Sequence, residues 1–449
     1  SSENYDDKLL SFFARANYNY NNRYLFTATM RADGSTVFSN KHKWGYFPSF
    51  SAAWRVSEEK FMKSLPWISN MKVRFGWGIV GNDRISNYLS MDLYEAVKYG
   101  VGNNVMTVLN PKQLKNSNLK WEGSSTTNLG IDLGFFDNRL NVTADFFIKN
   151  TKDLLLSQSL AHITGFDSQM QNVGKIQNKG IELSLNSTNI QTRNFTWQTN
   201  FNISFIRNTL KSLASGVNYM QARSGFDSNF TSYDYMAIVG QSLGLIYGYE
   251  FDGIYQYSDF YSVPGSSTLI LKEGVTSNPS LGNRLSPGAV KYKDQDGDGV
   301  ITTKDRTVIG NPFPDFTYGF GLNAAYKGFD LSAFFQGVAG VDRIVMDYPT
   351  VSGNVTTAFL DRYSESANPN GNFPRLGNGD YNSQPSSFWL KDASYLRLKN
   401  NELGYSFETL GHYEVKDIEI PNVKTMKQFA KNVIVSMDSI YKLIGCYDF

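Results

Sequence analysis

Apolar and polar side chains alternate along the stretch from Pro314 to Gln336. Every second residue from Phe316 to Tyr326 is apolar, and the positions between them are Thr, Gly, Asn and Ala. The alternation pauses at Lys327-Gly328 and then resumes, which predicts two antiparallel strands joined by a two-residue turn. Strands of about ten residues, with aromatics on one face and small polar residues on the other, are typical of a transmembrane β-barrel. We therefore expect lipid to cover the apolar face.

The same alternation recurs along the chain and predicts an all-β fold with about eleven strands by this count. The expected strands cover residues 14–20, 24–30, 50–56, 71–79, 129–135, 140–148, 181–185, 195–205, 316–326, 329–335 and 395–407.

Connection lengths predict how these strands are oriented. Connections near residues 21, 137, 192 and 327 are tight, whereas those after 32, 80, 150, 207 and 338 are long. Outer-membrane barrels have short periplasmic turns and long external loops. Residues 207–313 and 338–388 are therefore predicted to be extracellular loops, and the strand-like stretch Gly240–Gln256 to belong to the first of them.

Composition supports a membrane barrel without a membrane helix. Aromatic residues make up 15% of the 449 residues and charged residues only 19%. The mean hydropathy is nevertheless −0.35, and no stretch approaches the roughly 20 apolar residues of a spanning helix. The net charge of +2 gives no reason to expect nucleic acid as a partner. The single cysteine, Cys446, excludes an intrachain disulfide and fits a cytosolic or a bacterial envelope protein.

Two features predict that this chain is a fragment of a larger barrel. Its first residues, SSENYDDKLLSFF, lack a signal peptide. The alternatives are a protein that is not exported and a missing N-terminal part, and we expect the second because the chain opens almost directly into a strand. An open sheet would also expose two unpaired strand edges to hydrocarbon, where the backbone finds no water. Residues 1–410 are accordingly predicted to be a partial barrel and 411–449 a divergent tail. For that tail, an amphipathic helix over 423–443 and a truncated or frame-disrupted gene end remain alternatives.

Seven stretches resemble the SusC/RagA family of TonB-dependent outer-membrane transporters from Bacteroidetes-type bacteria, and they occur in the same order as in that family. They are RADGST (31–36), WGYFPSFSAAWRVSEEKFM (44–62), NLKWEGSSTTNLGIDLGFFDNRLNVTADFF (118–147), NVGKIQNKGIELSLN (172–186), VGQSLGLIYGYEFDGIYQ (239–256), KYKDQDGDGVITTKDRTVIGNPFPDFTYGF (291–320) and FWLKDASYLRLKNNELGYSF (388–407).

The resemblance implies a location and partners. Family members resemble barrels of about 22 strands with an N-terminal plug, so this chain would hold about half of the strands, without the plug domain. They are expected in the bacterial outer membrane, in contact with its lipid, beneath a SusD-like surface lipoprotein. The resemblance implies nutrient import, with oligosaccharide or, less often, peptide as cargo. Contact with the TonB complex would pass through the missing plug.

One stretch has the spacing of a calcium-binding loop. Residues 294–305, DQDGDGVITTKD, carry oxygen ligands at the intervals of an EF-hand and a glycine at its sixth position. The alternative is an acidic turn held by aspartate hydrogen bonds. If the loop binds Ca²⁺, the ion would stiffen an external loop. The predicted ligands are Asp294, Asp296, Asp298, the Val300 carbonyl, Thr302 and Asp305.

Candidate cargo contacts and a candidate nucleophile lie in the same predicted loop. Tyr247, Tyr249 and Tyr255 are predicted either to stack on sugar rings or to form the core of the loop. Gly240–Gly244 matches the G-x-S-x-G pattern of hydrolases, but the only later histidine is His412 and a β-rich stretch follows. We therefore expect no enzyme. Two rival hypotheses are a secreted or surface carbohydrate-binding protein and an esterase that uses Ser242.

Overall fold

The computed structural model describes residues 7–102, 104–224, 233–280, 285–345, 356–375 and 384–406. The predicted tail, residues 411–449, lies outside these ranges. The chain divides into two units, Ser1–Gly404 and Tyr405–Phe449. The first unit holds the main sheet apart from the last residue of its final strand.

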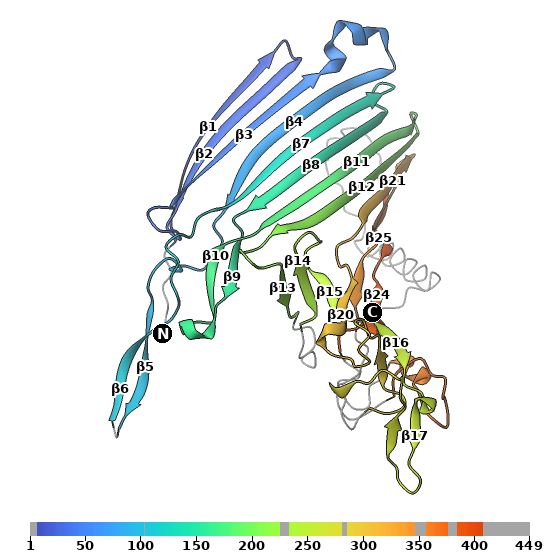
Figure 1. Cartoon of the computed structure of the whole chain (residues 1–449). Helices are drawn as coiled ribbons and strands as arrows, with labels where there is room; N and C mark the ends of the chain where they lie inside the picture. Colours follow the sequence, from blue (N-terminus) through green and yellow to red (C-terminus); the bar gives the residue numbers. More distant parts are fainter. Residues whose placement is uncertain are drawn as a thin grey trace, which may run out of the picture. The chain divides into compact units, whose positions relative to one another are not determined.

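Eleven strands form one sheet in chain order, which confirms the all-β prediction and its strand count (Figure 1). The strands are β1 (Leu9–Tyr20), β2 (Tyr24–Ser35), β3 (Trp44–Arg55), β4 (Ile68–Asn82), β7 (Glu122–Phe135), β8 (Leu140–Lys152), β11 (Lys175–Gln191), β12 (Phe195–Ser212), β21 (Phe316–Tyr326), β22 (Phe329–Ala339) and β25 (Tyr395–Tyr405).

The β21–β22 hairpin shows why this sequence folds as a sheet. The two strands pair from Phe316↔Ala339 to Tyr326↔Phe329 without a register shift. Lys327 and Gly328 have φ of 46° and 87°, the two positive values that a two-residue turn of this twist requires. In an antiparallel pair, residues directly opposite each other point to the same face of the sheet. The apolar side chains of both strands therefore lie on one face.

That apolar face is exposed over most of the sheet. Phe26, Phe50 and Phe75 on three successive strands are 40%, 41% and 41% exposed. Among the described residues, the remaining strands form sheets of only two to four strands, and the helical turns are of the 3-10 type. No helix in these ranges is long and apolar enough to cross a bilayer. An uncovered apolar face is expected where lipid provides the cover.

The opposite face is polar and its side chains bond from strand to strand. Asn208 Nδ2 donates to Asn178 Oδ1 at 2.7 Å, and Thr27 Oγ1 donates to Asn17 Oδ1 at 3.0 Å. Such a face can line an aqueous passage.

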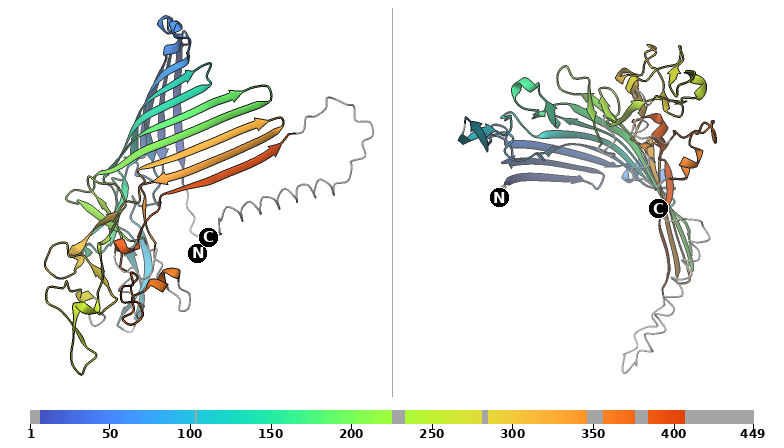
Figure 2. Two further views of the ribbon diagram at one scale, coloured as in Figure 1. Left: turned by 90° about the vertical axis from the view of Figure 1, so that its right-hand side faces the viewer. Right: turned by 90° about the horizontal axis from the view of Figure 1, so that it is seen from below.

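The tight turns lie at one end of the sheet, together with the 3-10 turns between β3 and β4, and the other long connections lie at the opposite end (Figures 1 and 2). The long connections contain hairpins where the sequence pattern predicts loops. β5 (Tyr94–Val101) pairs with β6 (Asn104–Pro111), and β9 (Leu155–Ser159) pairs with β10 (Ser168–Asn172). In β5–β6 both faces carry apolar residues, so the pattern lacks the period of two that marks a half-buried strand.

Candidate functional site

The connection from β12 to β21 is a folded unit with its own core. A four-stranded sheet joins β13 (Tyr219–Ala222), β14 (Tyr235–Ile238), β15 (Leu245–Tyr249) and β20 (Arg306–Gly310), and β16 (Phe251–Ile254) pairs with β19 (Val290–Tyr292). This unit contains two buried hydrophobic clusters. They contain Tyr255, Phe260 and Ala289, and Val290, Tyr292 and Ile301.

The connection from β22 to β25 packs against this unit. The Tyr249 N–H donates to the Pro385 carbonyl at 2.9 Å, and the Phe251 N–H donates to Ser387 Oγ at 2.8 Å. Beside these bonds, Trp389 is buried together with two phenylalanines, Phe359 and Phe373. The two predicted external loops therefore fold together, which sequence reasoning missed because the partners are 136 residues apart.

The aspartate-rich loop lies between β19 and β20. Gly297 and Gly299 have φ of 77° and 80°, so the sharp turn expected at the sixth position, Gly299, is present. The Gly297 and Gly299 N–H groups both donate to the Asp294 carboxylate at 2.7 Å. At the eighth position Ile301 is 4% exposed and anchors the loop in the adjacent core.

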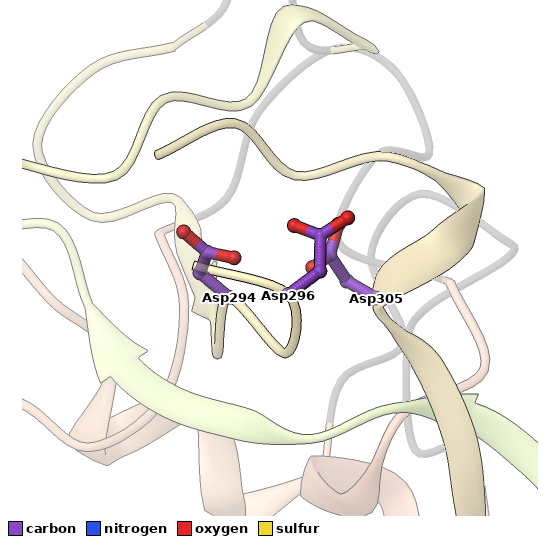
Figure 3. Close-up of side chains that lie close together, drawn as sticks. All are labelled: Asp294, Asp296 and Asp305. Carbon is purple, nitrogen blue, oxygen red and sulfur yellow. The ribbon is translucent and has the colours of Figure 1, made fainter. Parts of the chain in front are cut away.

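Three of the predicted ligands converge. Asp294, Asp296 and Asp305 each offer a carboxylate oxygen, and these oxygens lie within 4.8 Å of one another (Figure 3). Asp305 is fully buried. Burial alone would raise the pKa of Asp305, but backbone N–H donors, from Thr302 first and then Gln295 and Asp296, outweigh it and lower that pKa. The Asp305 carboxylate is thus held in its charged form.

Asp298, the fourth predicted carboxylate, lies outside this group, whereas the Thr302 hydroxyl donates to Asp305 Oδ2 at 3.4 Å. Asp298 Oδ1 accepts from the Val300 N–H at 2.8 Å, while Thr302 caps the following turn by accepting from the Lys304 N–H. Calcium prefers several carboxylate and carbonyl oxygens, and a carboxylate oxygen that accepts one N–H retains a second lone pair. The three aspartates therefore fit a hard divalent cation, although the set is smaller than the six ligands predicted.

The three tyrosines predicted to contact cargo are buried in the loop core to different extents. Tyr255 is fully buried, and its hydroxyl donates to the Thr276 carbonyl at 2.6 Å. Tyr249 stacks on Tyr292 with centroids 4.7 Å apart. The Arg306 guanidinium lies 4.9 Å from the Tyr247 ring and 5.6 Å from the Tyr249 ring. Tyr247 and Tyr249 are half-buried and retain some accessible surface.

An ion cluster on the polar face joins three strands. Arg74 of β4 makes two bonds to the Asp132 carboxylate of β7, at 2.8 and 2.9 Å, and one to Asp145 of β8 at 3.1 Å. A Cβ at Gly130 would lie 2.4 Å from the Asp145 carboxylate, so glycine leaves the room that this cluster needs. The sequence indicated a polar position at Arg74 but not its partners.

The Gly240–Gly244 stretch is a loop whose backbone pairs with the end of β12. Gly240 N–H donates to the Leu210 carbonyl at 2.7 Å, and Leu210 N–H donates to the Gln241 carbonyl at 2.8 Å. Of the three histidines in the sequence, only His42 and His162 lie in the described residues, and both are in other connections. The strand, turn and helix of a nucleophile elbow are not formed around Ser242, because β14 precedes it and β15 follows it.

Comparison with known proteins identifies the fold. Residues 1–416 match the family model described as "TonB dependent receptor-like, beta-barrel". TonB-dependent receptor P3 of Formosa agariphila is 36% identical over 406 residues, which cover 89% of this chain and 39% of that protein. TonB-dependent receptor SusC of Bacteroides thetaiotaomicron is 32% identical over 413 residues, covering 90% and 38%.

A solved structure agrees with these relatives. The structure described as the RagAB peptide transporter superposes with a TM-score of 0.71 at 26% identity, over 89% of this chain and 41% of the matched chain. The chain thus spans about two fifths of the length of the relatives it matches. The sheet, its lipid-compatible face and these similarities show that the chain belongs to the TonB-dependent receptor β-barrel family, in its SusC/RagA branch.

Proposed function

We propose that this chain forms part of the wall of a transporter that imports a nutrient across the outer membrane. The main support for the proposal is the eleven-stranded sheet, which lies within the part of the chain that matches the family. One face of the sheet is apolar and exposed, and on the other face polar side chains form hydrogen bonds between strands. Membership of the family places the chain in the bacterial outer membrane. The exposed apolar face also favours a membrane wall over a soluble carbohydrate-binding module, which would bury that face.

The cargo that we propose is an oligosaccharide, with a peptide as the alternative. The SusC-type resemblance supports the first, and the description of the RagAB structure as a peptide transporter supports the second. A SusD-like lipoprotein would cover the loop end of the barrel, and TonB would act through a plug encoded outside this stretch. We expect no chemistry on the cargo, because the loop around Ser242 lacks the elements of a hydrolase site.

Uptake by cells tests the proposal. A strain that lacks the complete gene should lose uptake of either labelled oligosaccharides or labelled peptides, and a plasmid copy should restore it. Removing the TonB-contacting segment from that copy should abolish the rescue. Unchanged uptake of both cargo classes would contradict transport, and a complete protein that stays soluble without detergent would favour the binding module.

We further propose that Asp294, Asp296 and Asp305 hold a structural Ca²⁺. Their convergent oxygens support this role, and an ion there would neutralise repulsion among three carboxylates and stiffen the loop. It would take part in no reaction.

Calcium titration of the complete receptor in detergent tests this proposal. Asp294→Asn and Asp305→Asn should each weaken Ca²⁺ binding at least tenfold, since each removes a charged ligand. Asp252→Asn is the matched control, because Asp252 lies in the same unit and pairs with Lys291 outside the cluster. Calorimetry that detects no Ca²⁺ binding to the unaltered receptor would refute the metal site.

A further inference from the structure

The connection between β3 and β4 differs from the other connections at its end of the sheet. Short turns join β1 to β2, β7 to β8, β11 to β12 and β21 to β22 there. Residues 56–67, the β3–β4 segment, instead form two 3-10 turns, η1 (Val56–Glu58) and η2 (Lys60–Ser64) (Figure 1). Val56 and Met62 are both buried, so the segment has a packed inner side.

Glu59 holds the middle of the segment on the lipid-facing side of the sheet. Its carboxylate accepts from the Tyr24 hydroxyl at 2.8 Å and from Trp54 Nε1 at 3.1 Å. Tyr24 and Trp54 pair with each other across β2 and β3, and Tyr24 stands two residues before Phe26 of the exposed apolar face. Side chains two residues apart in a strand share a face, so Glu59 binds two residues of the apolar face.

The end of the segment lies on the same side. Trp67 stacks on Phe135 of β7, with ring centroids 5.7 Å and planes 9° apart. Phe135 is in phase with Leu129, which pairs with Phe75 of the exposed apolar face. The β3–β4 segment therefore continues the apolar face past the ends of the strands.

Apolar side chains of the segment remain uncovered. Phe61, Trp67 and Leu65 are 61%, 47% and 37% exposed. Aromatic residues beside the ends of membrane strands lie at the level of the lipid headgroups. Because this group adjoins the lipid-facing side of the sheet, lipid is the material that reaches it first.

Two lysines accompany this apolar group. Lys60 and Lys63 are exposed, and residues three apart in a 3-10 turn lie on the same side. The two glutamates of the segment pair with arginines, Glu58 with Arg55 and Glu59 with Arg23. Neither lysine forms an ion pair with a described residue, so both charges face the surroundings.

We propose that the β3–β4 segment binds anionic phospholipids in the leaflet at the tight-turn end of the sheet. That leaflet is the periplasmic one if the short turns face the periplasm, as in other outer-membrane barrels. An anionic headgroup balances the two lysine charges, while the exposed rings lie among the headgroups and upper acyl chains. The inference rests on the proposed membrane wall and adds a lipid-binding site to it.

Hydrogen exchange of the complete receptor in lipid nanodiscs tests this site. The discs contain phosphatidylcholine alone or equal parts of phosphatidylcholine and phosphatidylglycerol. Exchange over residues 57–67 should be roughly fivefold slower with phosphatidylglycerol, the effect of about one lysine near an anionic surface. High salt should remove the difference, because it screens exposed charges.

The lysines are tested by a double variant, Lys60→Gln with Lys63→Gln. It should lose the difference between the two kinds of disc and should keep the heat-modifiable mobility of the folded receptor, since both side chains are exposed. Lys327→Gln is the matched control, because it removes one lysine from a turn at the same end of the sheet, between β21 and β22. It should retain the difference.

The apolar group is tested by Phe61→Ser. This change should speed exchange of the segment in both kinds of disc, because contact with acyl chains does not depend on headgroup charge. Ile163→Ser, which replaces a 95% exposed residue of another connection, should leave the segment unchanged.

Three results would overturn the site. They are equal exchange of the unaltered receptor in both kinds of disc, a difference that persists in the double variant, and slowing by lipid A in place of phosphatidylglycerol. If the unaltered receptor still restores uptake to cells that lack the gene, transport stands and only the phospholipid site fails.

Discussion

Glu59 lies beside the tight-turn ends of β2 and β3, where its carboxylate binds side chains of both strands. Its carboxylate accepts from the Tyr24 hydroxyl at 2.8 Å and from Trp54 Nε1 at 3.1 Å, and Arg23 lies 3.5 Å away. These hydrogen bonds, from Tyr24 first and then Trp54, lower the pKa of Glu59. Aromatic rings with polar ends bonded in this way suit the membrane interface.

Glu59→Gln should destabilise the receptor, because an amide oxygen accepts these hydrogen bonds less strongly than a carboxylate. Since the folded state lowers the pKa of Glu59, its stabilisation is present above the unfolded value of 4.5 and is lost as pH falls through the folded pKa. The unfolding temperature in detergent should therefore differ between variant and parent at pH 7 and converge in acid. Glu58→Gln, in an exposed pair with Arg55, is the control, and an equal effect of both variants would contradict the role of Glu59.

Tyr255 provides a second test at the residue scale. Tyr255→Phe should cost the external loop unit about 1 kcal/mol, the usual net value of one hydrogen bond, through loss of the bond to Thr276. Burial raises the pKa of Tyr255, so its contribution is complete below the ordinary value of 10 and is lost as pH rises above it. Hydrogen exchange over residues 254–276 measures the change. Tyr261→Phe, whose ring is 59% exposed, should have no effect.

At the scale of elements, backbone conformation at the tight turns decides the register of the hairpins. Lys327-Gly328 and Asn21-Asn22 both have two successive positive φ values, which glycine and asparagine tolerate better than other residues. A shift of one residue would move the lipid-facing side chains to the polar face. These turns therefore protect the division between the two faces.

Gly328→Val should destabilise the β21–β22 hairpin by about 1–2 kcal/mol, because a β-branched residue is strained at positive φ. The yield of heat-modifiable receptor folded into lipid vesicles should fall. Asn22→Gly, at an equivalent position of the β1–β2 turn, should fold as well as the parent. Equal yields for Gly328→Val and Asn22→Gly would show that the turn does not control folding.

At the scale of the whole molecule, the main feature is the pair of open edges of the eleven-stranded sheet. Within the described residues, β1 and β25 each have one neighbour in the eleven-stranded sheet, and every residue of the 12-residue β1 is exposed. Unpaired backbone groups are very unfavourable in hydrocarbon. These edges need further strands on both sides.

The polypeptide of residues 1–449, prepared alone, should therefore form no closed and stable barrel. In liposomes it should give heterogeneous leakage or aggregates, whereas the complete receptor should insert as a uniform species. Conductance recordings distinguish the two results. A single, discrete pore from the isolated chain would contradict this prediction.

The sequence by itself determined the strands, their faces, the tight turns and the aspartate loop, because each depends on neighbours in the chain. A period of two decides which residues share a face, and the Lys327-Gly328 turn and the twelve-residue loop from Asp294 are local. Only the tertiary structure decided how the two long loops pack and which ligands converge. Those features join segments such as Phe251 and Ser387 that are 136 residues apart. Contacts at such separations depend on packing in space, and the sequence pattern of one segment does not report it.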